Sequence, residues 1–223
     1  MDNRSAEPGT GRALRAALTL AAAVGLAVLL LTLVRDATRE RVEASARARR
    51  VAAFEALLGG IAHDNDLLAD RIDVRDPELL GTDEPVPVYR ARLAGRPMAA
   101  ILETVAPHGY SGPVRLYIAV TPDGRLLGVR VIEHQETPGL GDAIEEQRSG
   151  WIRQFDGRSL EDPPPARWKV RKDGGDFDQF TGATVTPRAV VAAVRAALLF
   201  VERKGPALYA APSRSAQGTQ ATS

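Results

Sequence analysis

The longest uninterrupted apolar segment lies close to the start of the chain. Residues 16–34 carry no charged side chain, and Arg15 and Arg35 bound the segment. A helix of this length spans about 28 Å, close to the hydrocarbon core of a bilayer. The main alternative is a cleaved signal peptide, in which a shorter apolar region is closely followed by a small-residue cleavage site. Charged residues 35–41 follow here, and an A-x-A pattern appears only at 44–46. The pattern therefore favours an uncleaved membrane anchor.

A helical pattern continues beyond the anchor and stops at a glycine pair. Residues 36–58 contain neither Gly nor Pro, and Gly59 and Gly60 follow them. Such a pair is a typical helix stop. The apolar residues near one helical face are Val42, Ala46, Phe54, Leu57 and Leu58. We expect a stalk helix over 35–60.

After a loop over 77–87, the hydrophobic period changes from that of a helix to that of a strand. Apolar residues occupy positions 114, 116, 118 and 120, and they return at 127, 129 and 131. The intervening residues 121–125 read Thr-Pro-Asp-Gly-Arg, in which proline presets its own φ and glycine takes positive φ. The segments 88–93 and 98–105 flank Ala94-Gly95-Arg96 in the same way. The pattern predicts two hairpins of one antiparallel sheet.

A helix is expected over 143–155, followed by a short strand over 168–171. Asp142 is a candidate cap for the helix, and Gly150 weakens it. Its shared apolar face consists of Ile144, Trp151, Ile152 and Phe155.

The last predicted helix has clearer boundaries. Thr186 is the expected cap, Pro187 occupies the first helical position, and Gly205 ends the helix. The expected buried stripe consists of Val190, Val191, Val194, Leu198 and Val201. The polar composition of residues 206–223 predicts a disordered tail.

Composition excludes several classes of function. Lys+Arg is 29 and Asp+Glu is 28, so the net charge is +1 and there is no basic excess for binding nucleic acid. The chain has no cysteine, which excludes disulfides, thiol nucleophiles and cysteine-ligated iron–sulfur clusters. The chain has only three histidines, too few for a histidine-rich metal site, so we expect no metal centre.

The most informative segment for chemistry is a loop of small residues that leads into the last helix. Gly182 and Ala183 allow close approach to the backbone, and Thr181, Thr184 and Thr186 bring hydroxyl groups. A helix N-terminus offers unpaired N–H groups and a positive dipole end, which suit a phosphate. From spacing alone, an ordinary capped helix after a turn is the favoured interpretation.

Two familiar phosphate-binding motifs are excluded. No Gly-Lys-Ser/Thr follows these glycines, so the segment is not a Walker loop. Residues 139–141 read Gly-Leu-Gly, but Ile144 stands where a dinucleotide-binding fingerprint needs its third glycine.

Four segments together carry a resemblance to a known family. Residues 178–184 match the flavinylation motif D-x-x-(S/T)-G-A-T. Residues 134–142 resemble the segment H-x-E-T-P-G-L-G-D, residues 107–112 resemble P-x-G-Y-S-G, and residues 172–180 resemble the run that precedes the flavin threonine. Over about residues 14–203, the chain resembles the G subunit of the Rnf (Rsx) ion-translocating electron-transport complex, of the FMN-binding domain family.

The resemblance implies a cofactor and its site. Thr184 would carry FMN through a phosphoester bond, which a separate flavin transferase makes with FAD as donor. Thr181, Gly182 and Ala183 would lie on the phosphate side, and Lys172 would offset phosphate charge. The loop near the isoalloxazine ring would contain Glu136, Thr137, Gly139, Leu140 and Gly141.

The resemblance also implies an organisation and a function. The fold would be α+β, with an N-terminal tail over 1–15, a transmembrane anchor over 16–34, a stalk helix over 35–60, an FMN-binding domain with an antiparallel sheet over 61–205 and a disordered tail over 206–223. The chain would transfer electrons, together with the other membrane and redox subunits of a complex that couples ferredoxin and NAD to ion movement. It would act as a redox subunit of a translocase and not as a catalyst by itself.

Two other functions and one conflict remain open at this stage. The same attachment motif occurs in the C-type subunit of the sodium-pumping NADH:quinone reductase, and a cofactor-free membrane-anchored structural module is the plainer alternative. The resemblance implies a single-pass protein of the bacterial inner membrane with its FMN domain in the periplasm. Lys and Arg residues are nevertheless more frequent after the anchor than before it, which by the positive-inside rule favours the opposite orientation.

Overall fold

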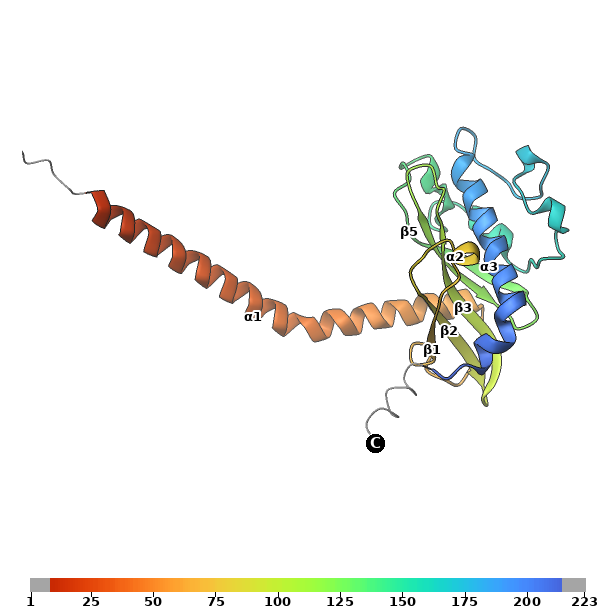
Figure 1. The fold of residues 1–223 in the computed structure, drawn as a ribbon, viewed down its shortest axis with the longest axis horizontal. Coiled ribbons are helices and arrows are strands. Elements are labelled where there is room, and N and C mark those ends of the chain that lie inside the picture. Colours follow the sequence, from red (N-terminus) through yellow and green to blue (C-terminus); the bar gives the residue numbers. More distant parts are fainter. Residues whose placement is uncertain (1–8, 214–223) are drawn as a thin grey trace, which may run out of the picture. The chain divides into compact units, whose positions relative to one another are not determined.

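The structure is a computed structural model that describes residues 9–213. The chain divides into two compact units, residues 1–50 and residues 51–223. Helix α1 (Gly9–Leu58) forms the described part of the first unit and enters the second, and all strands belong to the second unit (Figure 1).

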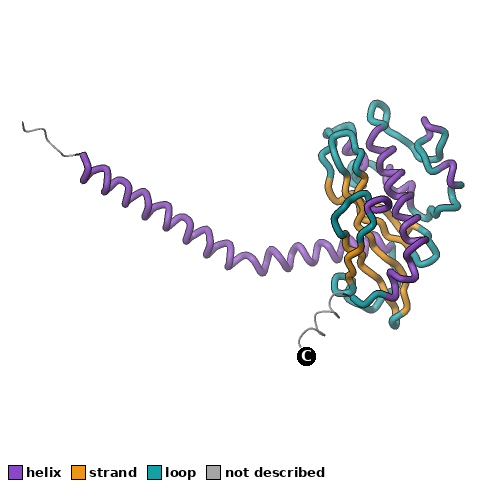
Figure 2. The backbone as a smooth tube through the Cα atoms, in the orientation of Figure 1, coloured by secondary structure: helices purple, strands orange, loops and turns teal. Residues whose placement is uncertain are grey.

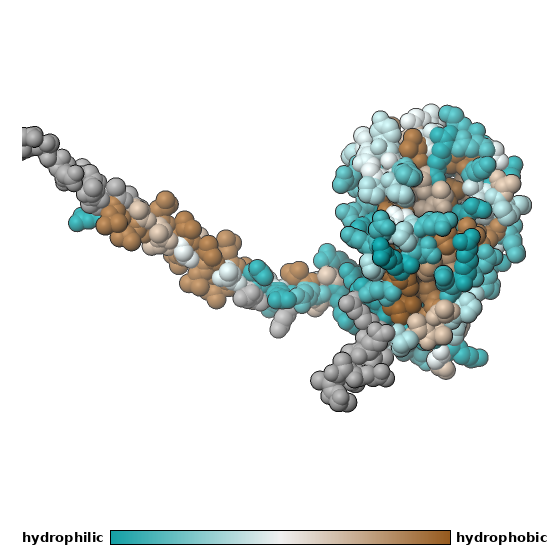
Figure 3. All heavy atoms as spheres, viewed as in Figure 1, coloured by the Kyte–Doolittle hydropathy of each residue, from teal (hydrophilic) through white to brown (hydrophobic). Residues whose placement is uncertain are grey.

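The first unit is a helix with an apolar surface. Its segment Ala17–Arg39 has a mean hydropathy of 2.6 and is long and apolar enough to cross a membrane. The large apolar side chains along it are exposed, and Figure 3 shows them as a continuous hydrophobic surface. The expected stop is confirmed, since α1 ends at Leu58 and Gly59 and Gly60 both take positive φ.

The second unit contains a five-stranded antiparallel sheet in the order β1-β2-β3-β4-β5 (Figure 2). Its strands are β1 (Arg71–Val74), β2 (Val86–Leu93), β3 (Arg96–Ala106), β4 (Val114–Val120) and β5 (Leu126–Glu133). Both expected hairpins are confirmed. The segment expected to be a loop over 77–87 instead contains the short helix α2 (Pro77–Leu80) and the start of β2, and β1 precedes it. The sequence did not predict β1 and α2, because an element of four residues is too short to show a hydrophobic period.

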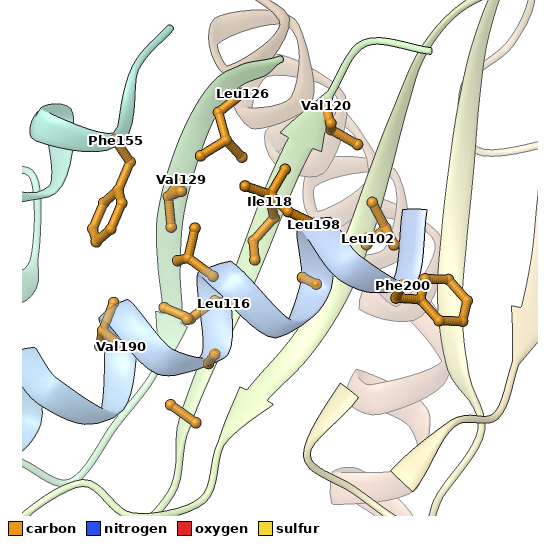
Figure 4. Close-up of a cluster of buried hydrophobic side chains, with 14 of the residues drawn as sticks. Leu102, Leu116, Ile118, Val120, Leu126, Val129, Phe155, Val190, Leu198 and Phe200 are labelled. Carbon is orange, nitrogen blue, oxygen red and sulfur yellow. The ribbon is translucent and has the colours of Figure 1, made fainter. Parts of the chain in front are cut away.

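Helix α3 (Val185–Ala210) covers one face of this sheet. Figure 4 shows Val190 and Leu198 of α3 pointing toward Leu116 and Ile118 of β4 and toward Val129 of β5. These side chains are at most 2% exposed. The expected apolar stripe of α3 is therefore confirmed as the core of the domain.

The last turns of α1 pack against the opposite face. Phe54, Leu57 and Leu58 join a second buried cluster with Tyr89 and Ile101. The rings of Phe54 and Tyr89 lie 4.8 Å apart. The sheet is thus covered on both faces, and the domain begins before residue 61, inside the helix that the sequence assigned to the stalk.

The C-terminal end of α3 lies five residues beyond the position that the sequence predicted. The helix continues through Gly205 and Pro206 to Ala210, so the expected disordered tail begins too early. The guanidinium of Arg90, which is 1% exposed, donates to the carbonyl oxygens of Leu208 at 2.9 Å and Ala211 at 2.5 Å. These bonds satisfy carbonyls that a helix end leaves unpaired. The expected disorder of residues 214–223 lies outside the described residues.

The expected helix over 143–155 is wrong. Two short 3-10 helices, η1 (Gly141–Ile144) and η2 (Trp151–Phe155), lie there instead. Ser149 Oγ accepts the backbone N–H of Trp151 at 3.1 Å, so η2 begins as a separate helix. The expected strand over 168–171 is reduced to a single bridge between Val170 and Phe177. The apolar residues are buried as expected, but polar and glycine residues between them interrupt the helix.

Replacement of Arg90 should destabilise the domain. Arg90→Ala removes the arginine donor from the carbonyls of Leu208 and Ala211 at the end of α3. It also removes one partner of Asp70, which keeps Arg92 at 2.7 Å. We expect a loss of about 3 kcal/mol in the free energy of unfolding. Chemical unfolding of the full chain in detergent, followed by tryptophan fluorescence, measures this loss. Arg96→Ala, at an exposed position, is the control and should change it by less than about 0.5 kcal/mol. Equal stability of both variants would contradict the role of Arg90.

Candidate functional site

The site begins at the N-terminus of α3. The helix is capped by Thr184, and not by Thr186 as the sequence predicted. Thr186 lies inside the first turn and is 1% exposed, with its Oγ1 accepting the backbone N–H of Tyr110 at 3.2 Å. The Thr184 side chain makes no capping hydrogen bond, so its hydroxyl does not serve the helix itself.

A tight turn delivers the chain to Thr184. Ala183 N–H donates to the Phe180 carbonyl at 3.2 Å, and Gly182 takes a φ of +84°. A positive φ at this turn position is the conformation for which glycine is preferred. Trp151 holds the preceding segment, because its Nε1 donates to the Asp178 carbonyl at 2.7 Å. The turn residues of the motif therefore have a structural reason.

A second loop faces this turn. Asp142 Oδ1 accepts the N–H of Gly139 at 2.8 Å, and Leu140 N–H donates to the Thr137 carbonyl at 3.1 Å. Gly139 takes a φ of +80°. These bonds fold residues 137–142 into a compact turn that presents the Leu140 side chain outward, 52% exposed.

The carboxylate of Glu136 joins that loop to a third one. Glu136 is 6% exposed, and its Oε1 accepts the N–H of Ser111 at 3.1 Å. A Cβ atom on Gly141 would lie 2.4 Å from Glu136 Oε2, and one on Gly109 would lie 2.9 Å from Oε1. At Gly141 the Glu136 side chain fills the space of a Cβ atom, and at Gly109 the Gly112 carbonyl oxygen, 2.3 Å from that position, is closer still. Both positions therefore favour glycine.

These loops and the N-terminus of α3 enclose a small cavity, here named the Thr184 pocket, of about 170 Å³. Seven of the predicted residues line it: Glu136, Thr137, Leu140, Gly141, Gly182, Ala183 and Thr184. Three do not: Thr181, Gly139 and Lys172. Sequence reasoning assigned no role to two further lining residues, Tyr110 and Val185, although Tyr110 belongs to one of the segments that carry the family resemblance.

The Thr184 pocket is bordered by exposed apolar side chains. Within residues 51–213, four large hydrophobic side chains are exposed, and three of them line the pocket: Tyr110 at 74%, Leu140 at 52% and Val185 at 42%. Exposed apolar groups gathered around one cavity are typical of a site for an apolar ligand surface.

The electrostatics of the pocket favour an anion beside Thr184. In the described chain, the backbone N–H groups of Val185 and Thr186 have no acceptor. Arg188 Nη1 lies 3.4 Å from Thr184 Oγ1, and the same guanidinium binds Asp173 at 2.5 and 2.7 Å. The hydrogen bond from Arg188 lowers the pKa of Asp173. Arg188, not Lys172, is thus the cation in contact with Thr184.

The fold and the pocket together define a class of protein. Residues 109–199 match the family model described as FMN-binding domain, and this range contains the three loops and the first half of α3. The chain therefore carries a flavin-binding domain behind an N-terminal apolar helix.

Sequence relatives give the particular family. The G subunit of the ion-translocating oxidoreductase complex of Pseudomonas aeruginosa is 49% identical over 197 residues, which cover 88% of this chain and 92% of the relative. The corresponding G subunit of Shewanella amazonensis is 48% identical over 169 residues, covering 76% and 79%. The chain belongs to this family, the G subunits of ion-translocating oxidoreductase complexes.

The crystal structure of Shewanella oneidensis NqrC is 23% identical to this chain and matches it with a TM-score of 0.47, covering 66% of this chain and 76% of that one.

The contact between Gly141 and Glu136 can be tested by adding one methyl group. Gly141→Ala should displace the Glu136 carboxylate and cost about 1–3 kcal/mol in the free energy of unfolding. Gly150→Ala is the matched control, because a Cβ there meets no atom within 4 Å and the φ of −76° suits alanine. Unfolding of the two full-length variants in detergent measures the difference. If Gly141→Ala were as stable as Gly150→Ala, the packing of Glu136 would be looser than described.

Proposed function

We propose that this chain is the electron-transfer subunit of an Rnf-type ion-translocating complex and carries FMN in a phosphoester bond to Thr184. One observation carries the proposal: Thr184 lies at the N-terminus of α3 inside the only segment that matches the flavinylation motif, and its pocket gathers the second motif loop. The sequence relatives, which are G subunits of ion-translocating oxidoreductase complexes, favour this complex over the sodium-pumping reductase.

The residues around Thr184 fit the phosphate of FMN. The N–H groups of Val185 and Thr186 point from the first turn of α3, where the helix dipole favours negative charge. Arg188 adds a guanidinium within 3.4 Å of Thr184 Oγ1. A phosphoester on that oxygen would therefore meet two kinds of donor without any rearrangement of the helix.

The rest of the pocket fits the ring. Leu140, Tyr110 and Val185 offer apolar surface, and the Glu136 carboxylate keeps the two loops that carry Leu140 and Tyr110 together. FMN itself supplies the redox chemistry, and the protein supplies position and surroundings. Because the apolar groups are exposed, the ring would remain accessible to a neighbouring redox centre of the complex.

Attachment needs a separate enzyme. A threonine hydroxyl is a weak nucleophile unless a base activates it. In the described residues, the side chain in contact with Thr184 Oγ1 is Arg188, which stays protonated and cannot act as that base. We therefore propose that a flavin transferase moves the FMN half of FAD to Thr184 Oγ1 and releases AMP.

The attachment residue can be tested on a denaturing gel. Co-expression of the full chain with a flavin transferase should give a band that fluoresces under ultraviolet light, and Thr184→Val should give a dark band. Thr181→Ser is the matched control, because the motif accepts either hydroxyl residue at this position and Thr181 does not line the pocket, so its band should still fluoresce.

Each other result has a defined meaning. A fluorescent Thr184→Val band would place the flavin on another residue. Dark bands for all three chains, with a transferase active on a second substrate, would contradict the flavoprotein proposal and leave a structural module.

We also propose that α1 anchors the chain in the bacterial inner membrane and that the domain faces the periplasm. The apolar segment Ala17–Arg39 supports the anchor. The periplasmic orientation rests on the family resemblance. A covalent tether is consistent with it, since the bond would retain the flavin outside the cytoplasm, where free cofactor is dilute.

A reporter fused to the C-terminus tests this orientation. Alkaline phosphatase, which is active only outside the cytoplasm, should be active in the fusion, and a cytoplasmic reporter at the same position should be inactive. The reverse pair of activities would show that the excess of Arg after the anchor sets the orientation instead.

A further inference from the structure

His134 lies directly after β5 and bonds two sides of the loop that lines the Thr184 pocket. Its Nδ1 accepts the backbone N–H of Glu136 at 3.0 Å, and its Nε2 lies 2.7 Å from Glu145 Oε1. A backbone N–H can only donate, so Nδ1 must present a lone pair. The single proton of the neutral ring is therefore on Nε2, where it bonds the Glu145 carboxylate.

The bond to Glu136 continues into the pocket. Glu136 holds the N–H of Ser111 through its carboxylate, and the neighbouring Tyr110 N–H donates to Thr186 Oγ1 in the first turn of α3. An unbroken chain of hydrogen bonds and backbone thus links the ring of His134 to the helix end that carries Thr184.

Charged side chains surround His134. The hollow that it lines also contains Arg130, Glu133, Glu145 and Glu146. Arg130 pairs with Glu146 at 2.7 Å, so Glu145 is the carboxylate in contact with the ring. A positive charge on His134 would therefore keep a partner on its Nε2 side.

We propose that neutral His134 positions the wall of the Thr184 pocket and that protonation of its Nδ1 releases that wall. This inference rests on the proposed flavin at Thr184 and assigns a regulation of the same site. When Nδ1 takes a proton from solvent, Glu145 keeps its bond, but the Glu136 N–H loses its acceptor and faces a second donor. The loop with Thr137 and Leu140 then loses the bond that fixes its start.

Two substitutions separate the two bonds of the ring. In His134→Asn, the amide oxygen can occupy the position of Nδ1 and accept from Glu136, and this acceptor does not titrate. In His134→Gln, the longer amide can reach Glu145 in place of Nε2, but the acceptor for Glu136 is lost. The first variant should keep the pocket wall at any pH, and the second should lack it.

Amide hydrogen exchange of the peptide over 134–142 measures the wall directly. The full chain is compared with both variants at about pH 8 and about pH 5, always at equal pH so that intrinsic exchange rates cancel. At the higher pH, His134→Gln should exchange about tenfold faster than the wild type and His134→Asn, as expected for one lost hydrogen bond. At the lower pH, the wild type should exchange like His134→Gln, while His134→Asn stays protected.

The flavin gives a second readout. In the loaded wild type, the visible absorption of the flavin should shift between the two pH values, and in loaded His134→Asn this shift should be absent.

The exchange series is repeated in Thr184→Val, which carries no flavin. A wild type without covalent flavin would contradict the proposed function, and the exchange pattern in Thr184→Val would still decide the role of His134. Equal protection of wild type and His134→Asn at the lower pH, or full protection in His134→Gln, would overturn the inference.

Discussion

The burial of the apolar stripe of α3 against β3, β4 and β5 fixes the rest of the domain. The stripe side chains are almost fully removed from water, and their packing sets both the direction of the helix and its position along the sheet. The N-terminus of α3 consequently lies beside the loops that leave β3 and β5. Because the helix is packed along its length, its N-terminus and the cap residue Thr184 are held in place with it.

The two ends of α3 are treated in opposite ways. At the C-terminus, buried Arg90 and half-buried Arg92 donate to the carbonyls of Leu208, Tyr209 and Ala211. At the N-terminus, the cap side chain makes no capping hydrogen bond and two N–H groups have no acceptor among residues 9–213. Unpaired backbone groups cost stability unless solvent or a ligand satisfies them. The open end coincides with the motif threonine, which supports the proposal of a phosphate at this end of the helix and not at the other.

Periodicity predicted the elements that bury a regular face, and local chemistry decided the others. Two hairpins and the stripe of α3 follow from alternation and from spacing of three and four residues. The helix expected at 143–155 fails because Ser149 and Gly150 interrupt it, although Trp151 and Phe155 are buried as its apolar face required. The motif located Thr184 and most of its pocket. Arg188 was missed because its contact depends on where α3 begins, and Lys172 was preferred only for its charge.

The small size of the pocket and the covalent bond of the proposal are consistent with each other. A cavity of about 170 Å³ with Leu140, Tyr110 and Val185 at its edge offers contact on limited surface, too little to retain a dissociable flavin in dilute surroundings. A deeper pocket would retain the cofactor but would also cover the ring and lengthen the path to a partner subunit. A covalent tether keeps the flavin at a high effective concentration without the contact area of a deeper pocket. The ring can then stay exposed on an apolar rim, and the loops that form the rim, not the tether, determine how it is oriented.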